Sequence, residues 1–254
     1  MTLSALLPTR PVAFFGRVLL SSAAALVGRW CFRRQDFARV LADSSANALP
    51  IVMVVNFLVG AILAFVGAVQ LQQFGAGIFV ADLVGIAVVR ELAAVITAVV
   101  MAGRTAAAFA AELATMRANE EIDALEVLGL DAVEYLVQPR VIALVLMMPL
   151  MYLYACVAGL AGGLLVGVTM LDLAPVAYVQ RSFEALSLSY FAFGFVKALV
   201  FGALLAITGC YCGMNAARNA AGVGEATTRA VVASIVGVVI IDALFAFCAE
   251  ALGI

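Results

Sequence analysis

The stretch that decides the fold reads RANEEIDALEVLGLDAVEYLVQPR and covers residues 117–140, between two long apolar blocks. Asn119 is placed to cap a short helix that runs to Leu128, and Gly129 is placed to stop it. The apolar side of this helix is Ile122, Leu125 and Leu128, and its acidic side is Glu120, Glu121, Asp123 and Glu126. Such a division predicts an amphipathic helix at a water boundary. A plain solvated turn between two membrane helices is the alternative.

Composition indicates an integral membrane protein. The 254 residues are 66% hydrophobic and 12% charged, with a mean hydropathy of +1.17, whereas about half of a soluble domain is apolar. The net charge of -2 argues against a nucleic-acid partner, which would call for a basic patch. The chain has no histidine, so it offers neither a Ser-His-Asp triad nor a histidine metal site. We therefore predict no catalytic residues, no metal ligands and no cofactor.

Five apolar runs are long enough to cross a bilayer, since about 20 helical residues span its hydrocarbon core. The second run is longer than the bilayer is thick, so its end should project into water. In the third run Gly159, Gly163 and Gly167 recur every four residues, a spacing that lets another helix approach closely. The predicted spans are residues 49–71, 82–116, 140–171, 190–214 and 230–252, with an external segment at 172–189 and a loop at 215–229.

Two amphipathic segments precede the first span. Residues 12–30 are apolar at helical spacing but carry Arg17 and Arg29, too many charges for a span. Residues 33–48 continue with charged side chains opposite apolar ones. We interpret both as elbow-type interfacial helices, because Arg17 breaks the apolar run that a cleaved signal peptide would need. The chain is thereby divided into residues 1–48 and a membrane domain at residues 49–254.

The arginines indicate an orientation, because cytoplasmic loops are enriched in Arg and Lys. With the N-terminus inside, all fourteen cationic residues except Arg90, Arg181 and Lys197 fall at the cytoplasmic side. Arg181 lies in the external segment, and the other two lie within spans. Five spans then place the C-terminus outside and the helix at residues 119–128 in the cytoplasm, between the second and third spans.

Arg90, Glu91, Lys197 and Asp242 are ionisable residues that fall within the parts of the spans that cross the membrane. Each costs on the order of 2.5–3.5 kcal/mol there and so requires a partner or a wet cavity. Arg90 and Glu91 are neighbours on a helix and point about 100° apart, so one can face a cavity while the other pairs elsewhere. Anchoring near the outer headgroups is the simpler alternative for these two. Lys197 and Asp242 fall at similar depths, which predicts a buried structural pair.

A longer pattern surrounds the charged stretch, GRxxAAxxAELxxMRxxEEIDALExLGLD followed by YLVxPR. QLQQFGA and VRELAAVITAV within residues 70–99, and GVGEATTRAVV at residues 222–232, agree with it. From about residue 50 onward the sequence resembles the MlaE/YrbE family, the membrane permeases of Mce-type ABC lipid transporters. Ala94 and Ala132 stand where that family commonly has proline, and Ala106 and Ala114 replace frequent glycines. Local kinks and packing distances are therefore expected to differ.

The resemblance implies an all-α permease subunit of the bacterial inner membrane with a cytoplasmic coupling helix between the second and third spans. Its implied cargo is phospholipid, moved between the inner membrane and a periplasmic partner in maintaining outer-membrane lipid asymmetry. The implied partners are a second copy of the chain, cytoplasmic ABC ATPase subunits and a periplasmic Mce-domain lipid-binding subunit, with a small cytoplasmic STAS-type accessory subunit as a further candidate. No GxxxxGK[ST] loop occurs in the sequence, so another chain is expected to bind ATP.

The resemblance also implies two sets of site residues. The first set would line an outward-facing lipid pocket where two permease copies meet. It consists of Leu63, Gln70, Leu71, Phe74, Arg90 and Glu91. The second set would couple the permease to the ATPase, and it consists of Glu120, Glu121, Asp123, Leu125 and Glu126. Independently of the family, four carboxylates on a helix of roughly 15 Å call for cationic partners.

Two other functions remain as alternatives. An ion-coupled secondary transporter of a hydrophobic substrate would use Arg90, Glu91, Lys197 and Asp242 as its charge pathway. Such transporters are commonly built from inverted repeats, and five spans divide badly into two halves. An intramembrane enzyme acting on lipids would need a pair of carboxylates or cysteines at one depth, and the sequence shows no convincing pair.

Overall fold

A computed structural model describes residues 14–18, 34–45 and 47–252, and the regular structure in these ranges is entirely helical. Within the described residues, five stretches are long and apolar enough to cross a membrane. They are Phe37–Gln72, in which residue 46 is not described, Gly77–Ala118, Val133–Leu171, Leu188–Met214 and Ala220–Ala251. The predicted class, an all-α integral membrane protein with five spans, is confirmed. Of the first amphipathic segment only residues 14–18 are described, and these are helical.

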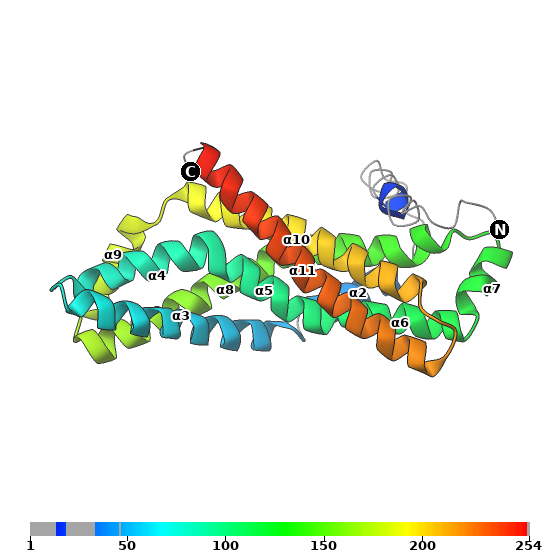
Figure 1. The fold of residues 1–254 in the computed structure, drawn as a ribbon, viewed down its shortest axis with the longest axis horizontal. Coiled ribbons are helices and arrows are strands. Elements are labelled where there is room, and N and C mark those ends of the chain that lie inside the picture. Colours follow the sequence, from blue (N-terminus) through cyan, green and yellow to red (C-terminus); the bar gives the residue numbers. More distant parts are fainter. Residues whose placement is uncertain (1–13, 19–33, 46, 253–254) are drawn as a thin grey trace. The chain divides into compact units, whose positions relative to one another are not determined.

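The elements follow one another along the chain as Figure 1 shows. The described chain before the second span forms α2 (Arg34–Ser45) and α3 (Leu49–Gln72). The second span comprises η2 (Gly77–Phe79), α4 (Val80–Ala87), η3 (Val88–Leu92), α5 (Ala93–Met101), η4 (Ala102–Ala106) and α6 (Ala107–Ala118). Then come α7 (Glu121–Val127), η5 (Val133–Val137), α8 (Gln138–Leu171), α9 (Pro175–Ala185), α10 (Leu188–Met214) and α11 (Ala220–Leu252).

Two segments that are predicted to lie between spans contain helix. The external segment at residues 172–189 holds α9, which begins at Pro175, a residue favoured in the first helical turn. The last helix begins at Ala220 rather than near residue 230, so the loop before it shrinks to residues 215–219. The early start has a local cause, since the Asn219 side-chain oxygen accepts a hydrogen bond from the Gly222 N–H at 2.7 Å. That is the geometry of a helix N-cap.

Three helical turns are wider than an α-helix. The segments η3, η4 and η5 are π-helical, and two of them interrupt the second span. Tyr152 of α8 donates a hydrogen bond to the Val89 carbonyl inside η3 at 2.8 Å. Apolar periodicity did not predict these turns, because one extra residue in a turn barely changes an almost wholly apolar pattern. Turns of this kind occur frequently at functional sites.

Contacts divide the chain into two compact units. Unit 1 consists of Met1–Ser44, Met101–Val145 and Gly202–Gly237. Unit 2 consists of Ser45–Val100, Leu146–Phe201 and Val238–Ile254. Each unit therefore collects stretches that are distant in the sequence.

Glycines bring the helices of unit 2 close together. A Cβ added to Gly60 of α3 would collide with the backbone of Gly159 in α8, and a Cβ added to Gly162 would collide with the Phe57 carbonyl. Gly167 lies against the ring of Tyr178 in α9, where an added Cβ would be 2.6 Å from the ring. The prediction that the glycines of the third span admit close neighbours is confirmed.

Asn56, which interrupts the apolar first span, forms hydrogen bonds inside unit 2. Asn56 is buried, and its amide donates to the Val52 carbonyl at 2.9 Å and to Thr97 Oγ1 at 3.4 Å. A buried amide with partners costs little, whereas an unpartnered one in a membrane would cost several kcal/mol. Asn56 thus helps to set α3 against α5.

Candidate functional site

An ion cluster lies inside the spans of unit 2, with Lys197 of α10 at its centre. The lysine has no exposed surface, and its Nζ forms ion pairs with Glu91 Oε2 of η3 and with Asp242 Oδ1 of α11. The Asp242 pair is 2.6 Å long but lacks hydrogen-bond geometry. The same Nζ lies 5.1 Å from the centre of the Phe193 ring. The predicted pair between Lys197 and Asp242 is therefore confirmed, and Glu91 joins it.

Arg90 extends the cluster along η3. Its Nε lies 3.5 Å from Glu91 Oε1, and its guanidinium carbon lies 5.9 Å from the centres of both the Tyr190 and Phe193 rings. These distances are within the range of cation–π attraction. Both side chains reach toward α10, the arginine toward its two rings and the glutamate toward Lys197.

Two cations and two carboxylates leave the cluster without net formal charge. Desolvating such groups is costly unless each finds an opposite partner, and each has one here within ion-pair distance. Exposure is uneven, since Lys197 is fully buried while the side chains of Arg90 and Glu91 are 24% and 32% exposed. Lys197 can therefore hold the cluster together while Arg90 and Glu91 remain accessible to a ligand.

The predicted lipid-binding residues fall into two groups in unit 2. Leu63, Gln70, Leu71 and Phe74 lie on the last turns of α3 and just beyond it, and Phe74 is 80% exposed. Gly67 of α3 packs against α4 near its start, about two turns before Arg90 and Glu91. No described contact joins the α3 group to Arg90 or Glu91. A ligand touching both groups would therefore have to extend along α4.

Helix α7 turns sharply away from α6 (Figure 1). The turn occurs at Glu120, whose φ of 62° is left-handed. Glu120 occupies the N-cap position that the sequence analysis gave to Asn119. Asn119 instead ends α6, and its amide donates to Glu121 Oε1 at 3.1 Å. The predicted helix is thus shorter than expected at this end.

The other end of α7 stops at Gly129, as predicted. Gly129 has a φ of 78°, and its N–H bonds to the Glu126 carbonyl at 3.0 Å. The Leu130 N–H bonds to the Leu125 carbonyl at 3.0 Å. These two bonds form the paired C-terminal motif that a glycine in the left-handed region permits.

The surface of α7 differs from the predicted two-sided pattern. Ile122 is buried and Leu125 is half-buried, but Leu128, the C-cap residue of α7, is 73% exposed. Val127 is 87% exposed and Leu130 is 42% exposed. We call Val127, Leu128 and Leu130 the α7 tip. An apolar tip beside acidic side chains is typical of a surface that contacts another protein.

The carboxylates of α7 are not equivalent. Arg218, in the loop between α10 and α11, lies 2.8 Å from Asp123 Oδ2 and also donates to Oδ1 at 3.1 Å. Asp123 thus finds its cation within unit 1. Glu120, Glu121 and Glu126 are exposed, and no ion pair neutralises them among the described residues. These three carboxylates are therefore the ones that call for cationic groups on another protein.

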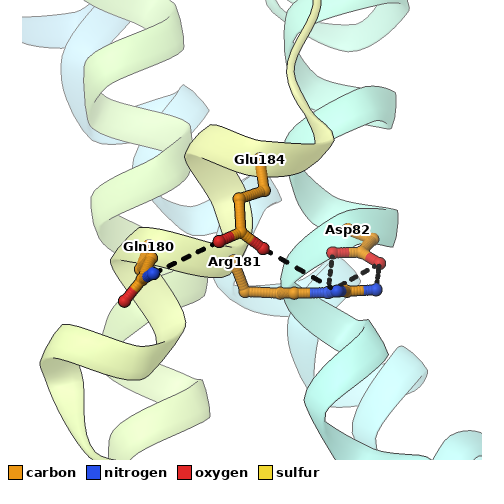
Figure 2. Close-up of polar contacts among 4 residues, drawn as sticks. All are labelled: Asp82, Gln180, Arg181 and Glu184. Carbon is orange, nitrogen blue, oxygen red and sulfur yellow. Dashed lines mark hydrogen bonds and ion pairs between the residues drawn. The ribbon is translucent and has the colours of Figure 1, made fainter.

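A separate ion pair joins α9 to α4 in unit 2 (Figure 2). Arg181 donates through Nε to Asp82 Oδ1 at 3.0 Å and through Nη2 to Asp82 Oδ2 at 2.9 Å. Its guanidinium lies 5.0 Å from the centre of the Phe79 ring. Figure 2 also shows Glu184, which accepts a 3.2 Å bond from Gln180 and lies 3.9 Å from Arg181. Arg181 and Glu184 lie in the predicted external segment, but no sequence pattern identifies Asp82, which is 99 residues away.

The described part of the chain holds no group of three or more Cys, Asp or Glu side chains suited to a metal ion. Cys156 and Cys210 are buried as free thiols, whereas Cys248 is exposed. The sites that remain for function are therefore the ion cluster with the end of α3, and α7 with its tip.

Comparison with known proteins places these sites in context. Residues 37–248 match a family described as Permease MlaE. A probable ABC transporter permease protein of Rickettsia typhi is 42% identical over 188 residues, which cover 74% of this chain and 73% of the relative. A protein of the same description from Synechocystis is 39% identical over 196 residues, covering 76% and 74%. The chloroplastic protein TRIGALACTOSYLDIACYLGLYCEROL 1 of Arabidopsis thaliana is 37% identical over 173 residues, covering 68% of this chain and 49% of the relative.

Proposed function

The chain belongs to the MlaE permease family and is a permease subunit of an ABC transporter, and on this basis we propose that its cargo is phospholipid. The name of the Arabidopsis relative contains that of a diacylglycerol lipid, which is in keeping with a lipid cargo. We further propose that the lipid moves between the inner membrane and a periplasmic Mce-type subunit. The N-terminus lies in the cytoplasm and the C-terminus in the periplasm, in line with the distribution of the arginines.

The observation that carries the lipid proposal is the pairing of two surfaces in unit 2. The neutral ion cluster leaves Arg90 and Glu91 partly exposed, so one cation and one carboxylate face outward. The end of α3 offers Leu63, Leu71 and the exposed ring of Phe74, and Gly67 of the same helix packs against α4 about two turns before Arg90. A phospholipid has both kinds of surface, a charged headgroup and apolar chains. A second copy of the chain closes this site by covering the exposed face of α3.

The partner proposal rests on α7. Its three unpaired carboxylates and its apolar tip fit a socket on an ABC ATPase that is apolar at the centre and cationic at the rim. In this arrangement α7 is the coupling helix, and Glu120, Glu121, Leu125 and Glu126 contribute to the contact. Asp123 contributes indirectly, because Arg218 already binds it.

Co-purification tests the assignment as a whole. The chain is tagged in its native membrane, the proteins recovered with it are identified, and lipid transfer is measured in vesicles with and without ATP. We expect an ABC ATPase to be recovered and labelled phospholipid to move only with ATP. Transfer that follows an ion gradient, with no ATPase recovered, would establish the secondary transporter instead, with Arg90, Glu91, Lys197 and Asp242 as its charge pathway.

Photo-crosslinking tests the lipid site separately. Crosslinkers at Phe74 and Glu91 are expected to capture labelled phospholipid in the assembled transporter. Leu153 of α8 is 42% exposed on a membrane helix of unit 2 and serves as the control for ordinary lipid contact. Capture at Phe74 and Glu91 no greater than at Leu153 would remove the pocket assignment.

A further inference from the structure

A cavity of about 350 Å³ lies in unit 1, outside the proposed transport site. One wall is α2, which contributes Arg39 and Val40. The opposite wall belongs to α6 and to the segment that leads into α8, with Phe109, Met116 and Leu136 as its apolar part. The cavity therefore combines charged and apolar walls beside an amphipathic helix.

Arg140 forms the buried cationic end of this cavity. It is 8% exposed, and its guanidinium lies 5.8 Å from the centre of the Phe109 ring. Nη1 donates to the Leu136 carbonyl at 2.6 Å, and Nη2 donates to Glu112 Oε2 at 2.9 Å. Its Nε has no hydrogen-bond partner among the described residues. These contacts hold the guanidinium in one place and leave one donor unused.

Arg39 forms the open cationic end. Its side chain is exposed on α2, and no ion pair neutralises it within the described chain. Glu112 supplies the opposite charge, since its side chain is 57% exposed and only Oε2 pairs with Arg140. Asp43 lines the same cavity, and its carbonyl accepts a 2.9 Å bond from Arg104 that ties α2 to η4. Both signs of charge are thus available within one cavity.

From this arrangement we infer that the cavity binds a zwitterionic phospholipid of the cytoplasmic leaflet. The phosphate lies between Arg39 and Arg140, because a guanidinium matches phosphate oxygens in geometry and charge. The headgroup ammonium lies at the free Glu112 oxygen, and an acyl chain covers the wall of Phe109 and Met116. Basic pockets beside membrane helices on the cytoplasmic side are typical headgroup sites. The leaflet follows from the orientation proposed above, whereas the site does not depend on what the transporter carries.

A photo-crosslinker at Met116 in the assembled transporter gives a local readout of this site. Vesicles contain a labelled probe, which is phosphatidylethanolamine, phosphatidylglycerol or diacylglycerol. We expect the strongest capture with phosphatidylethanolamine, weaker capture with phosphatidylglycerol, which lacks the ammonium, and the weakest with diacylglycerol, which lacks the phosphate as well. Inorganic phosphate added in excess should not compete, because the acyl chain supplies part of the affinity. Equal capture of the three lipids, stronger capture of phosphatidylglycerol, or displacement by phosphate would overturn the assignment.

Substitutions distinguish lipid binding in this cavity from a general effect of surface charge on lipid capture. Arg39→Gln is expected to lower the apparent affinity for phosphatidylethanolamine about tenfold, as the loss of one charge-assisted hydrogen bond implies, and Arg39→Lys should restore part of it. Val40→Trp should lower capture by filling the cavity without changing charge. Arg229→Gln is the matched control, because it removes an exposed arginine that is already paired with Glu225. An Arg39→Gln protein that captures lipid as well as the Arg229→Gln protein would refute the proposal, whatever its transport activity.

Discussion

Replacing Lys197 by methionine is the most informative single change to the ion cluster. Methionine is similar in length to lysine, so the substitution removes the charge while largely filling the same space. Glu91 keeps Arg90 as a partner, because the two side chains are 3.5 Å apart. Asp242 loses the only cation that pairs with it among the described residues. The Lys197→Met protein therefore carries one uncompensated carboxylate within its spans.

The size of the effect follows from that unpaired charge. Breaking a buried ion pair by removing one partner costs about 3–5 kcal/mol. The side chain of Asp242 is 26% exposed, so we expect the lower end, about 3 kcal/mol. For a domain of this size 1 kcal/mol corresponds to roughly 2–4 °C, which predicts a fall in Tm of roughly 6–12 °C.

A second substitution should reverse most of this loss. Lys197→Met combined with Asp242→Asn removes both charges of the broken pair and leaves Arg90 and Glu91 as a neutral pair. We expect the doubly substituted protein to melt within about 4 °C of the unmodified protein, because replacing a whole buried pair is often close to neutral. Arg90 thus becomes the remaining counter-ion of the cluster.

The measurement is thermal unfolding of the purified permease in detergent, with Val196→Met as the control for adding a methionine at a neighbouring, exposed position of α10. If the Tm of the Lys197→Met protein is within 2 °C of the Tm of the control, the lysine contributes no net stabilisation. A doubly substituted protein no more stable than the Lys197→Met protein would show that the unpaired Asp242 is not the cause. Either result refutes the reasoning.

Three further predictions concern topology, coupling and α9. A cysteine introduced at Glu121 should react with an impermeant reagent only after permeabilisation, and one at Gln180 should react from outside; the reverse pattern would invert the orientation. Glu120→Lys combined with Glu121→Lys should leave the permease inserted while lowering ATPase recovery about tenfold or more, as measured by co-purification; unchanged recovery would remove α7 from the interface. Arg181→Gln should leave Asp82 unpaired and increase proteolysis between α9 and α10, whereas an unchanged digestion pattern would show that the ion pair does not hold α9.

Some long-range features of the fold could be predicted from the types of residues and their spacing along the chain. Five spans follow from the length of the apolar runs, and the pairing of Lys197 with Asp242 follows from the cost of leaving either charge alone in a membrane. Close helix packing follows from the glycine spacing around Gly159. In each case the wrong arrangement would be costly in a membrane, and the residues that would incur the cost are recognised by their type and their depth in a span.

The details that could not be predicted depend on which helices meet. Glu91 pairs with Lys197 across 106 residues, and Asp82 pairs with Arg181 across 99. Nothing in either local pattern identifies the partner. The early start of α11 was different, because Asn219 before an alanine-rich run is a local capping signal that could have been recognised. The exposure of Leu128 was missed because a helical wheel shows on which side of α7 a residue lies but not whether another element covers that side.

The burial of Lys197 also determines how this polypeptide responds to amine chemistry. It is the single lysine in the 254 residues, and its amine is enclosed between two carboxylates inside the spans. Reagents that acylate primary amines will therefore find no lysine of this chain at the surface. Amine-directed crosslinks obtained from the assembled transporter will report almost entirely on its partners. An Ala124→Lys protein changes this, since it presents one reactive side chain at an exposed position of α7 while keeping the carboxylates, and any new crosslink then identifies the molecule that α7 touches.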